Sequence, residues 1–394
     1  MSSTIWTSSS SALIFCAVVA AAVPLQATTT FVPVSNPKGI AYDDVSHTLY
    51  VASGSSVVRY DTQTNQFLPS IVLGSGQESL YGIDLSPDGK TLAVADDQST
   101  TNTNWIYEVD TATGAATQVT FQKNGPYGTY EGGTVTVAFG ADGNLLVSSD
   151  FPGSGQTPLR LYDPSTGNTT ILGLVDQAST LVPNANRETI AIAEGNSSLG
   201  PIDSYNVETG VFQHATYTNW FNAEVGVNSS ATQYAVSTYD GTFIYNSSFQ
   251  QIGMLGQYAN NGPIDVVYSP NSNVMYASWW SYGSGTRQVR EFSTTTFQQI
   301  GTLDAFGSQS GSFNQFSNYN FSNGDMTIAA DGSELFATIP GGISIINLPE
   351  PGTFVLAGIG LVALVGAARR NKPGRRHRQA TSKRPIWKDA AQGN

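Results

Sequence analysis

A pattern that recurs along residues 28–348 constrains the fold of this chain more than any other feature. Its clearest copies are Leu85–Asp96 (LSPDGKTLAVAD), Phe139–Asp150 (FGADGNLLVSSD) and Ile328–Ile339 (IAADGSELFATI). In each copy two apolar runs flank an Asp-Gly pair, which favours a tight hairpin because glycine readily adopts φ > 0. Aligning the first inward residue of the second strand gives seven units, 41 to 60 residues apart, at Leu49, Leu92, Leu146, Ile190, Tyr234, Met275 and Leu335.

A second signature follows these hairpins and marks a further turn. It reads YDTQTN at Tyr60–Asn65, VDTATG at Val109–Gly114, YDPSTG at Tyr162–Gly167 and YNVETG at Tyr205–Gly210. A fourth apolar run comes after the turn, so each unit holds about four strands. Units of this length and content are typical of β-propeller blades, which stack into a ring because one blade cannot bury both of its faces alone. We therefore predict an all-β, seven-bladed propeller; a pair of β-sandwiches is the rival arrangement.

The last unit, Phe321–Leu348, contains only three strands. We expect Thr28–Ser35 (TTTFVPVS) to supply the fourth, because pairing the two ends of the propeller closes the ring and removes an open sheet edge. The predicted propeller domain therefore spans residues 28–348.

The first 27 residues have the pattern of a secretory signal peptide. Ala12–Val23 forms a compact apolar core, and Leu25-Gln26-Ala27 is a plausible cleavage site, although no Lys or Arg precedes the core. An uncleaved N-terminal anchor is the alternative. The only cysteine, Cys16, lies in this segment, so the mature protein is expected to have neither disulfides nor a catalytic thiol.

The C-terminal region has three parts in a fixed order. Pro349-Glu350-Pro351 is stiff and extended, Thr353–Ala368 is uncharged and apolar, and Arg369-Arg370 begin a basic cluster. The apolar run is short for a membrane span of about 20 residues, but flanking arginines that snorkel extend its reach. The sequence predicts a short transmembrane helix whose basic side stays in the cytoplasm, followed by a basic disordered tail at residues 371–394. An ordinary C-terminal anchor is the alternative.

The order of these parts resembles the PEP-CTERM sorting signal of Gram-negative bacteria that make exopolysaccharide. Over residues 349–370, the resemblance implies transient anchoring in the inner membrane, processing by an exosortase, and transfer to the cell surface or the extracellular medium. One departure is that 26 residues follow Ala368, whereas the family usually ends soon after its arginines.

The body of the chain resembles YVTN-type and lactonase-like propellers, most clearly at Leu49–Asn65 (LYVASGSSVVRYDTQTN). These motifs form turns that many propellers share. The resemblance therefore supports the fold and says little about activity.

Charge is divided unevenly along the chain. Up to Ala368 there are eight Lys and Arg against 28 Asp and Glu, a formal charge of −20, and nine of the 17 basic residues follow. A body this acidic is repelled by nucleic acid, so we exclude nucleic-acid binding. The acidity suits solubility and the binding of cations.

Ligands of propellers usually meet the face where inner strands begin and second strands end. Carboxylates gather at the predicted inner-strand starts, so calcium or another divalent cation is a candidate cofactor; the alternative is a solvated acidic rim. The lactonase-like resemblance implies that such a metal would support hydrolysis. The candidate metal residues are Glu78, Glu131, Glu224, Asp265 and Asp325.

The same face also carries second-strand ends and aromatic loops. Exposed aromatic rings beside polar loops can stack on sugars, although at least one tryptophan of such a pair is expected to pack between blades. The candidate ligand face comprises Asp96, Asp150, Glu194, Trp279, Trp280 and Tyr282.

Other catalytic systems have little support. The only histidines of the body, His47 and His214, fall in different units, and no G-x-S-x-G, Walker or dinucleotide motif fits. We therefore predict a non-catalytic binding module at the cell surface or in the extracellular matrix, with exopolysaccharide or a surface protein as ligand. A metal-assisted lactonase-like hydrolase is the alternative.

Overall fold

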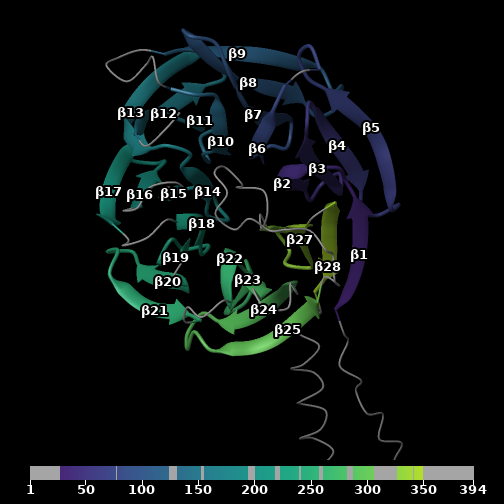
Figure 1. The fold of residues 1–394 in the computed structure, drawn as a ribbon, viewed down its shortest axis with the longest axis vertical. Coiled ribbons are helices and arrows are strands. Elements are labelled where there is room, and N and C mark those ends of the chain that lie inside the picture. The colour runs from purple at the N-terminus through teal and green to yellow at the C-terminus, as the bar shows by residue number, and fades with distance from the viewer. Residues whose placement is uncertain are drawn as a thin grey trace, which may run out of the picture. The chain divides into compact units, whose positions relative to one another are not determined.

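The computed structural model describes residues 27–348 except 77, 124–130, 152–154, 194–199, 218–221, 239–240, 257–260, 282–286, 306–325 and 340. These residues belong to one compact unit, Leu25–Glu350. They form 28 strands and no helix, arranged as seven four-stranded antiparallel sheets around a ring (Figure 1). The seven-bladed propeller is therefore confirmed. The predicted signal core, sorting helix and basic tail lie outside the described residues.

The first three blades follow one another along the chain, and each runs from an inner to an outer strand. Blade 1 contains β2 (Pro37–Asp43), β3 (Thr48–Ser53), β4 (Ser56–Asp61) and β5 (Gln66–Val72). Blade 2 contains β6 (Leu80–Leu85), β7 (Thr91–Ser99), β8 (Thr103–Asp110) and β9 (Ala116–Gln122). Blade 3 contains β10 (Thr134–Phe139), β11 (Leu145–Ser149), β12 (Gln156–Asp163) and β13 (Asn168–Asp176).

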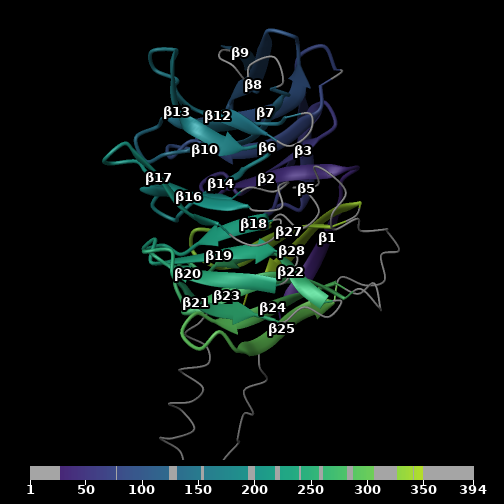
Figure 2. The ribbon, with the colours of Figure 1, turned by 60° about the vertical axis from the view of Figure 1, so that its left-hand side comes forward.

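The next three blades repeat this order, and Figure 2 shows them as separate tilted sheets. Blade 4 contains β14 (Thr180–Pro183), β15 (Thr189–Ala193), β16 (Pro201–Asn206) and β17 (Val211–Tyr217). Blade 5 contains β18 (Asn222–Val227), β19 (Gln233–Thr238), β20 (Gly241–Asn246) and β21 (Gln251–Leu255). Blade 6 contains β22 (Asn261–Tyr268), β23 (Val274–Ser281), β24 (Arg287–Ser293) and β25 (Gln299–Ala305).

Blade 7 joins the two ends of the propeller. It contains β26 (Met326–Ile328), β27 (Glu334–Ile339) and β28 (Gly342–Asn347), and its outer strand is β1 (Thr28–Pro33). The register runs from Thr28 opposite Asn347 to Pro33 opposite Gly342. The predicted closure by the N-terminal strand is confirmed, and it leaves no blade short of a strand.

The strand register corrects one position in the sequence alignment. In blade 2, Leu92 pairs with Leu85 and Val109. The equivalent residue of blade 3 is Leu145, which pairs with Phe139 and Tyr162, so the assignment of Leu146 was wrong by one residue. The turn after Phe139 is one residue shorter than the turn after Leu85, and repeat spacing alone does not reveal this difference.

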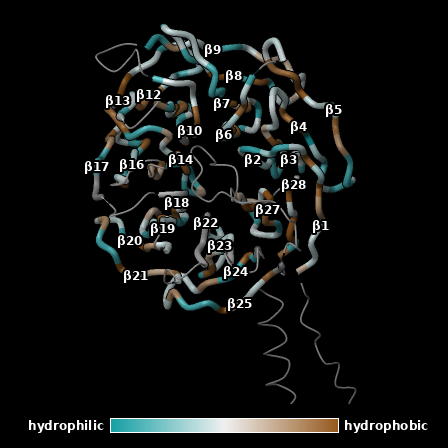
Figure 3. The backbone as a smooth tube through the Cα atoms, viewed as in Figure 1, coloured by the Kyte–Doolittle hydropathy of each residue, from teal (hydrophilic) through white to brown (hydrophobic). Residues whose placement is uncertain are grey.

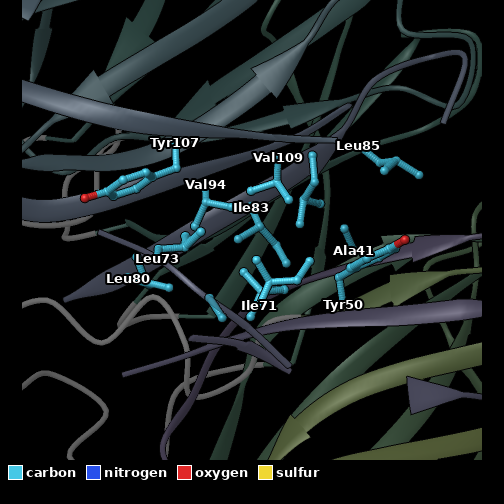
Figure 4. Packing of buried hydrophobic residues seen from close by; sticks show 13 residues of the cluster. Ala41, Tyr50, Ile71, Leu73, Leu80, Ile83, Leu85, Val94, Tyr107 and Val109 are labelled. Atoms are coloured by element: carbon cyan, nitrogen blue, oxygen red, sulfur yellow. The ribbon is translucent and has the colours of Figure 1, made fainter. Parts of the chain in front are cut away.

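The hydrophobic core is divided among the seven seams between neighbouring blades. At the seam of blades 1 and 2, Val94 and Val109 cluster with Tyr50 and Ile71 (Figure 4), and Leu92 belongs to the same cluster. Leu92 is fully buried, and burying such a side chain stabilises a fold by roughly 2 kcal/mol. Apolar stretches accordingly occur in every blade rather than in one central cluster (Figure 3).

The inner strands surround a central cavity of about 740 Å³. They approach one another so closely that glycine is required in places. A Cβ atom on Gly39 would lie 2.8 Å from the backbone nitrogen of Ile83, and one on Gly226 would lie 2.1 Å from the carbonyl oxygen of Val266. The absence of a side chain at these two glycines lets the innermost strands of neighbouring blades lie close together around the cavity.

A clamp of polar contacts joins three of these blades at the end of the cavity where inner strands finish. Asp84 of β6 accepts a hydrogen bond from the backbone N–H of Phe139 at 2.7 Å. The same carboxylate pairs with both terminal nitrogens of Arg187, at 2.6 and 2.9 Å. Arg187 follows β14, so one ion pair links blade 2 to blade 4 across blade 3.

Candidate functional site

Asp97 and Asp150 approach each other beside the start of β10, the inner strand of blade 3. Asp97 lies in β7 of blade 2, and Asp150 follows β11 of blade 3. Burial raises the pKa of Asp97 to about 7, and the nearby charges of Asp150 and Asp96 add to this effect. The ammonium group of Lys38 opposes the shift. Two partly buried carboxylates therefore share a site with one cation.

A glycine pair allows this approach. A Cβ atom on Gly133 would lie 2.0 Å from the carbonyl carbon of Asp97, and one on Gly132 would lie 3.0 Å from Cβ of Asp150. The backbone N–H of Asp150 donates to the carbonyl oxygen of Gly133 at 2.8 Å. Side chains at these two positions would force the carboxylates of blades 2 and 3 apart.

Lys38 and Tyr81 complete the group on the side of blades 1 and 2. The ammonium nitrogen of Lys38 lies 4.6 Å from the centroid of the Tyr81 ring, and both residues line the central cavity. Burial lowers the pKa of Lys38, and the charge of Asp97 opposes that change. We call Lys38, Tyr81, Asp97 and Asp150 the mouth site.

Asp150 has one buried carboxylate oxygen that is not satisfied within the described part of the chain. Burial raises its pKa, which a hydrogen bond from the backbone N–H of Phe151 opposes. Its Oδ1 atom is buried and has no hydrogen-bond partner within the described part of the chain. A ligand that donates a hydrogen bond would satisfy this atom.

Asp96, the predicted neighbour on the ligand face, has a structural role instead. It is fully buried, and its Oδ2 atom accepts a hydrogen bond from Nε1 of Trp105 at 2.8 Å. Its Oδ1 atom accepts from the backbone N–H groups of Ser79 and Gln98. These bonds fix the end of β7 and so position Asp97.

Glu131, a predicted metal residue, is bound within the protein. Its carboxylate forms a buried ion pair with the guanidinium of Arg160, with Oε2 2.8 Å from Nη2. The Oε1 atom also accepts from Nδ2 of Asn104 at 2.9 Å. The ion pair joins the start of blade 3 to β12. The carboxylate oxygens of Glu131 are therefore already bound and are not free to coordinate a cation.

Asp265, another predicted metal residue, links blade 6 to blade 7. It accepts hydrogen bonds of 2.6 Å from the backbone N–H groups of Val266 and Met326. Burial raises its pKa to about 7, although these two bonds favour the ionised form. Glu224 is buried beside the cavity, and Glu78 accepts a 2.6 Å bond from the N–H of Ser75.

The predicted metal residues that can be located are therefore spread over several blades. Calcium takes six to eight oxygen ligands. Within the described ranges, no group of three or more His, Cys, Asp or Glu side chains could hold a metal ion. These residues do not fit the metal that the lactonase-like resemblance implied, and Asp325 lies outside the described residues.

Trp279, predicted on the ligand face, packs between blades 5 and 6. It is 6% exposed and stacks on Phe292 with ring centroids 5.8 Å apart. Its ring is therefore no platform for a sugar, in keeping with the expectation that one tryptophan of the pair is buried. Trp280 belongs to β23, whereas Glu194 and Tyr282 lie outside the described residues.

The two histidines lie in different blades. His47 Nδ1 is 3.3 Å from the hydroxyl of Tyr42, and His214 Nδ1 is 2.7 Å from Oδ1 of Asp203. Neither belongs to the mouth site.

Sequence reasoning missed Asp97 and Tyr81. Asp97 directly follows Asp96 in the sequence. The prediction took only one residue at the end of each second strand, and in this blade it took Asp96. The Gly132-Gly133 pair before β10 was the available signal, because adjacent glycines before a strand indicate close backbone approach.

Comparison with known proteins identifies the C-terminal segment. Residues 347–370 match the model of the PEP-CTERM protein-sorting motif. The chain carries a PEP-CTERM sorting signal. It is therefore an exported protein with a propeller body, and the motif implies processing by an exosortase. The motif includes Pro349-Glu350-Pro351 and Arg369-Arg370, as the sequence predicted. Across the described residues, nothing helical has the length and apolar character of a membrane span.

Solved structures support the fold alone. A chain of the structure titled "Crystal Structure of Mitotic Checkpoint Complex" superposes with a TM-score of 0.61 at 10% sequence identity. The match covers 89% of this chain and 100% of that one. No curated protein matches this sequence. Because 1271 chains of solved structures match, the fold does not identify a ligand, and the YVTN or lactonase-like subtype stays a prediction.

Proposed function

We propose that this exported propeller is a non-catalytic module that binds polysaccharide at the cell surface or in the extracellular matrix, with the ligand held at the mouth site. The exopolysaccharide setting comes from the resemblance of the sorting signal. A surface protein is the other ligand class that the sequence predicted.

One observation carries this proposal: the carboxylates of Asp97 and Asp150 lie close enough to influence each other, beside Lys38, which lines the cavity. Carboxylates accept hydrogen bonds from neighbouring sugar hydroxyls, and an ammonium group donates to hydroxyl or ring oxygens. The buried Oδ1 atom of Asp150 lacks a donor among the described residues, and a sugar hydroxyl would supply one.

Affinity electrophoresis in gels that contain dextran, laminarin or galactomannan tests the proposal. We expect at least one polysaccharide to retard the protein, and Asp97→Asn and Asp150→Asn to weaken this effect at least fivefold. Asp88→Asn is the matched control, because Asp88 is an exposed carboxylate in the turn after β6, at the other end of the inner strand. Unchanged mobility in all three gels, or equal retardation of Asp97→Asn and wild type, would contradict polysaccharide binding at this site.

The second candidate is the metal-assisted lactonase-like hydrolase that the sequence predicted, although the carboxylates of the described residues form no metal cluster. One feature favours it, because a pKa of about 7 for Asp97 suits a general base. A calcium titration followed by thermal melting, with a lactone hydrolysis assay, separates the two candidates. A calcium-dependent melting shift together with lactone turnover, both lost in Asp97→Asn, would favour the enzyme. Neither signal is expected for the binding module.

A further inference from the structure

We infer that the seam between blades 5 and 6 holds a second ligand site, built on Arg290, that binds a single carboxylate. Arg290 lies in β24, and its guanidinium carbon is 4.2 Å from the centroid of the Trp279 ring. Its Nε atom donates to Oε1 of Gln288 at 3.2 Å. No carboxylate of the described residues forms an ion pair with Arg290.

The indole ring beneath the guanidinium is closely packed. Trp279 is held between Phe292, whose ring it stacks on, and the backbone of Gly256, where an added Cβ would lie 2.3 Å from the indole ring. A ring fixed on both sides fixes the guanidinium that stacks on it. Rigid presentation reduces the conformational entropy that a bound ligand must remove.

Two hydrogen-bond donors of this stack have no acceptor among the described residues. The terminal nitrogens of Arg290 make no hydrogen bond there, and the buried Nε1–H of Trp279 also has no partner. Buried donors are rarely left without an acceptor. Burial lowers the pKa of Arg290, and an anion placed beside it would reverse that effect. A negatively charged acceptor beside the guanidinium would satisfy the terminal nitrogens of Arg290.

The guanidinium geometry selects among anions. Its planar fork donates two parallel hydrogen bonds to a carboxylate, which a lysine cannot reproduce. The body of the chain has a formal charge of −20 up to Ala368, so it repels polyanions while a local cation still attracts one isolated charge. The ligand that fits is a uronic acid residue on an otherwise uncharged glycan. The glycan as carrier rests on the function proposed above, whereas the carboxylate is argued from this seam alone.

Titration of the purified protein with glucuronic acid tests the inference, followed by calorimetry and by tryptophan fluorescence. We expect saturable binding of glucuronate and none of its uncharged methyl ester. Arg290→Lys should weaken binding about tenfold, because the charge remains but the fork is lost. Arg290→Gln should abolish it. Arg59→Gln is the matched control. Among the described residues Arg59 also has no carboxylate partner and stacks on no ring, but it donates to the carbonyl oxygen of Pro69.

Three outcomes would overturn the inference: no saturable binding of glucuronate, equal binding of the methyl ester, or full binding by Arg290→Gln. If Arg290→Gln loses its cooperative melting transition, Arg290→Lys alone decides the question. Failure here is separate from failure of the polysaccharide proposal. Arg290→Gln should leave retardation by neutral polysaccharide unchanged, and Asp97→Asn should leave glucuronate binding unchanged.

Discussion

The hydroxyl of Tyr42 donates a hydrogen bond to Oε2 of Glu334, 3.1 Å away, across the seam where blade 7 meets blade 1. The same hydroxyl lies 3.1 Å from Oγ1 of Thr62. Burial raises the pKa of Tyr42, which keeps the phenol protonated as a donor. Tyr268 holds the equivalent position in blade 6, but its hydroxyl is buried and has no partner among the described residues. The two tyrosines therefore form a natural comparison.

We expect Tyr42→Phe to lower the free energy of unfolding by about 1 kcal/mol, because it removes a hydrogen bond and leaves the half-buried carboxylate of Glu334 without this donor. Tyr268→Phe removes an unpaired polar group and should be neutral or stabilising. Urea denaturation of both variants provides the measurement. Equal losses for the two substitutions would show that the Tyr42 bond adds nothing to closure.

Replacing Asp97 with asparagine should stabilise the protein in a pH-dependent way. Its pKa in the folded state is about 7, above that of an unfolded aspartate. A raised pKa gives stability that is fully present below about pH 4 and is lost as the pH rises through 7. The melting temperature of Asp97→Asn should therefore exceed that of wild type at pH 8, and the difference should vanish near pH 4.

Asp61 provides the opposite control. Hydrogen bonds from the turn residues Thr64 and Gln63 lower its pKa, so its contribution is present at neutral pH and disappears on acidification through the lowered pKa. Asp61→Asn should reduce the melting temperature at pH 8 and have little effect at pH 2. A destabilised Asp97→Asn at pH 8 would refute the electrostatic account of the mouth site.

The buried pair of Glu131 and Arg160 should be intolerant of single changes. Glu131→Gln leaves the Arg160 guanidinium, which is 1% exposed, without its counter-charge, and breaking a buried pair in this way costs about 3–5 kcal/mol. The double variant Glu131→Leu with Arg160→Met should recover most of the loss, because neither charge remains buried. Chemical denaturation of the two single variants and the double variant measures the coupling, and additive losses would contradict it.

Ring closure can be probed with two neighbouring residues of β1. Val32 is 1% exposed and packs in the seam between blades 7 and 1, whereas Phe31 is 46% exposed. Val32→Ala should cost about 2 kcal/mol through the cavity that it leaves. Phe31→Ala should cost clearly less, although its side chain is larger. Thermal melting compares them, and a greater loss for Phe31 would mean that β1 contributes through its outer surface.

The fold was largely readable from the sequence because the repeat specifies it locally. Asp-Gly turns and apolar alternation mark the hairpins, and the three-stranded last unit requires a partner for β28. Register was less certain, since the assignment of Leu146 instead of Leu145 followed from a turn that is one residue shorter. A one-residue change in a turn leaves the hydrophobic pattern almost unchanged.

The candidate site was less predictable, since it depends on which side chain pairs with which. Glu131 and Asp150 both lie near the Gly132-Gly133 pair, but Arg160 neutralises the first and not the second. Arg160 is 29 residues from Glu131, and nothing in the spacing of the chain indicates that pairing. Trp279 was expected to face solvent or a seam, and only its contact with Phe292 decides for the seam.

The pairing of β1 with β28 has a consequence for the export that the sorting signal implies. Thr28 and Asn347 lie opposite each other although 319 positions separate them, so the ring cannot close while either end of the propeller sequence is still in transit across the membrane. Before β1 pairs with β28, blade 7 has only three strands and the outer edge of β28 is open. Ring closure therefore depends on β28, which lies directly before the sorting motif and is the last strand of the propeller to be synthesised.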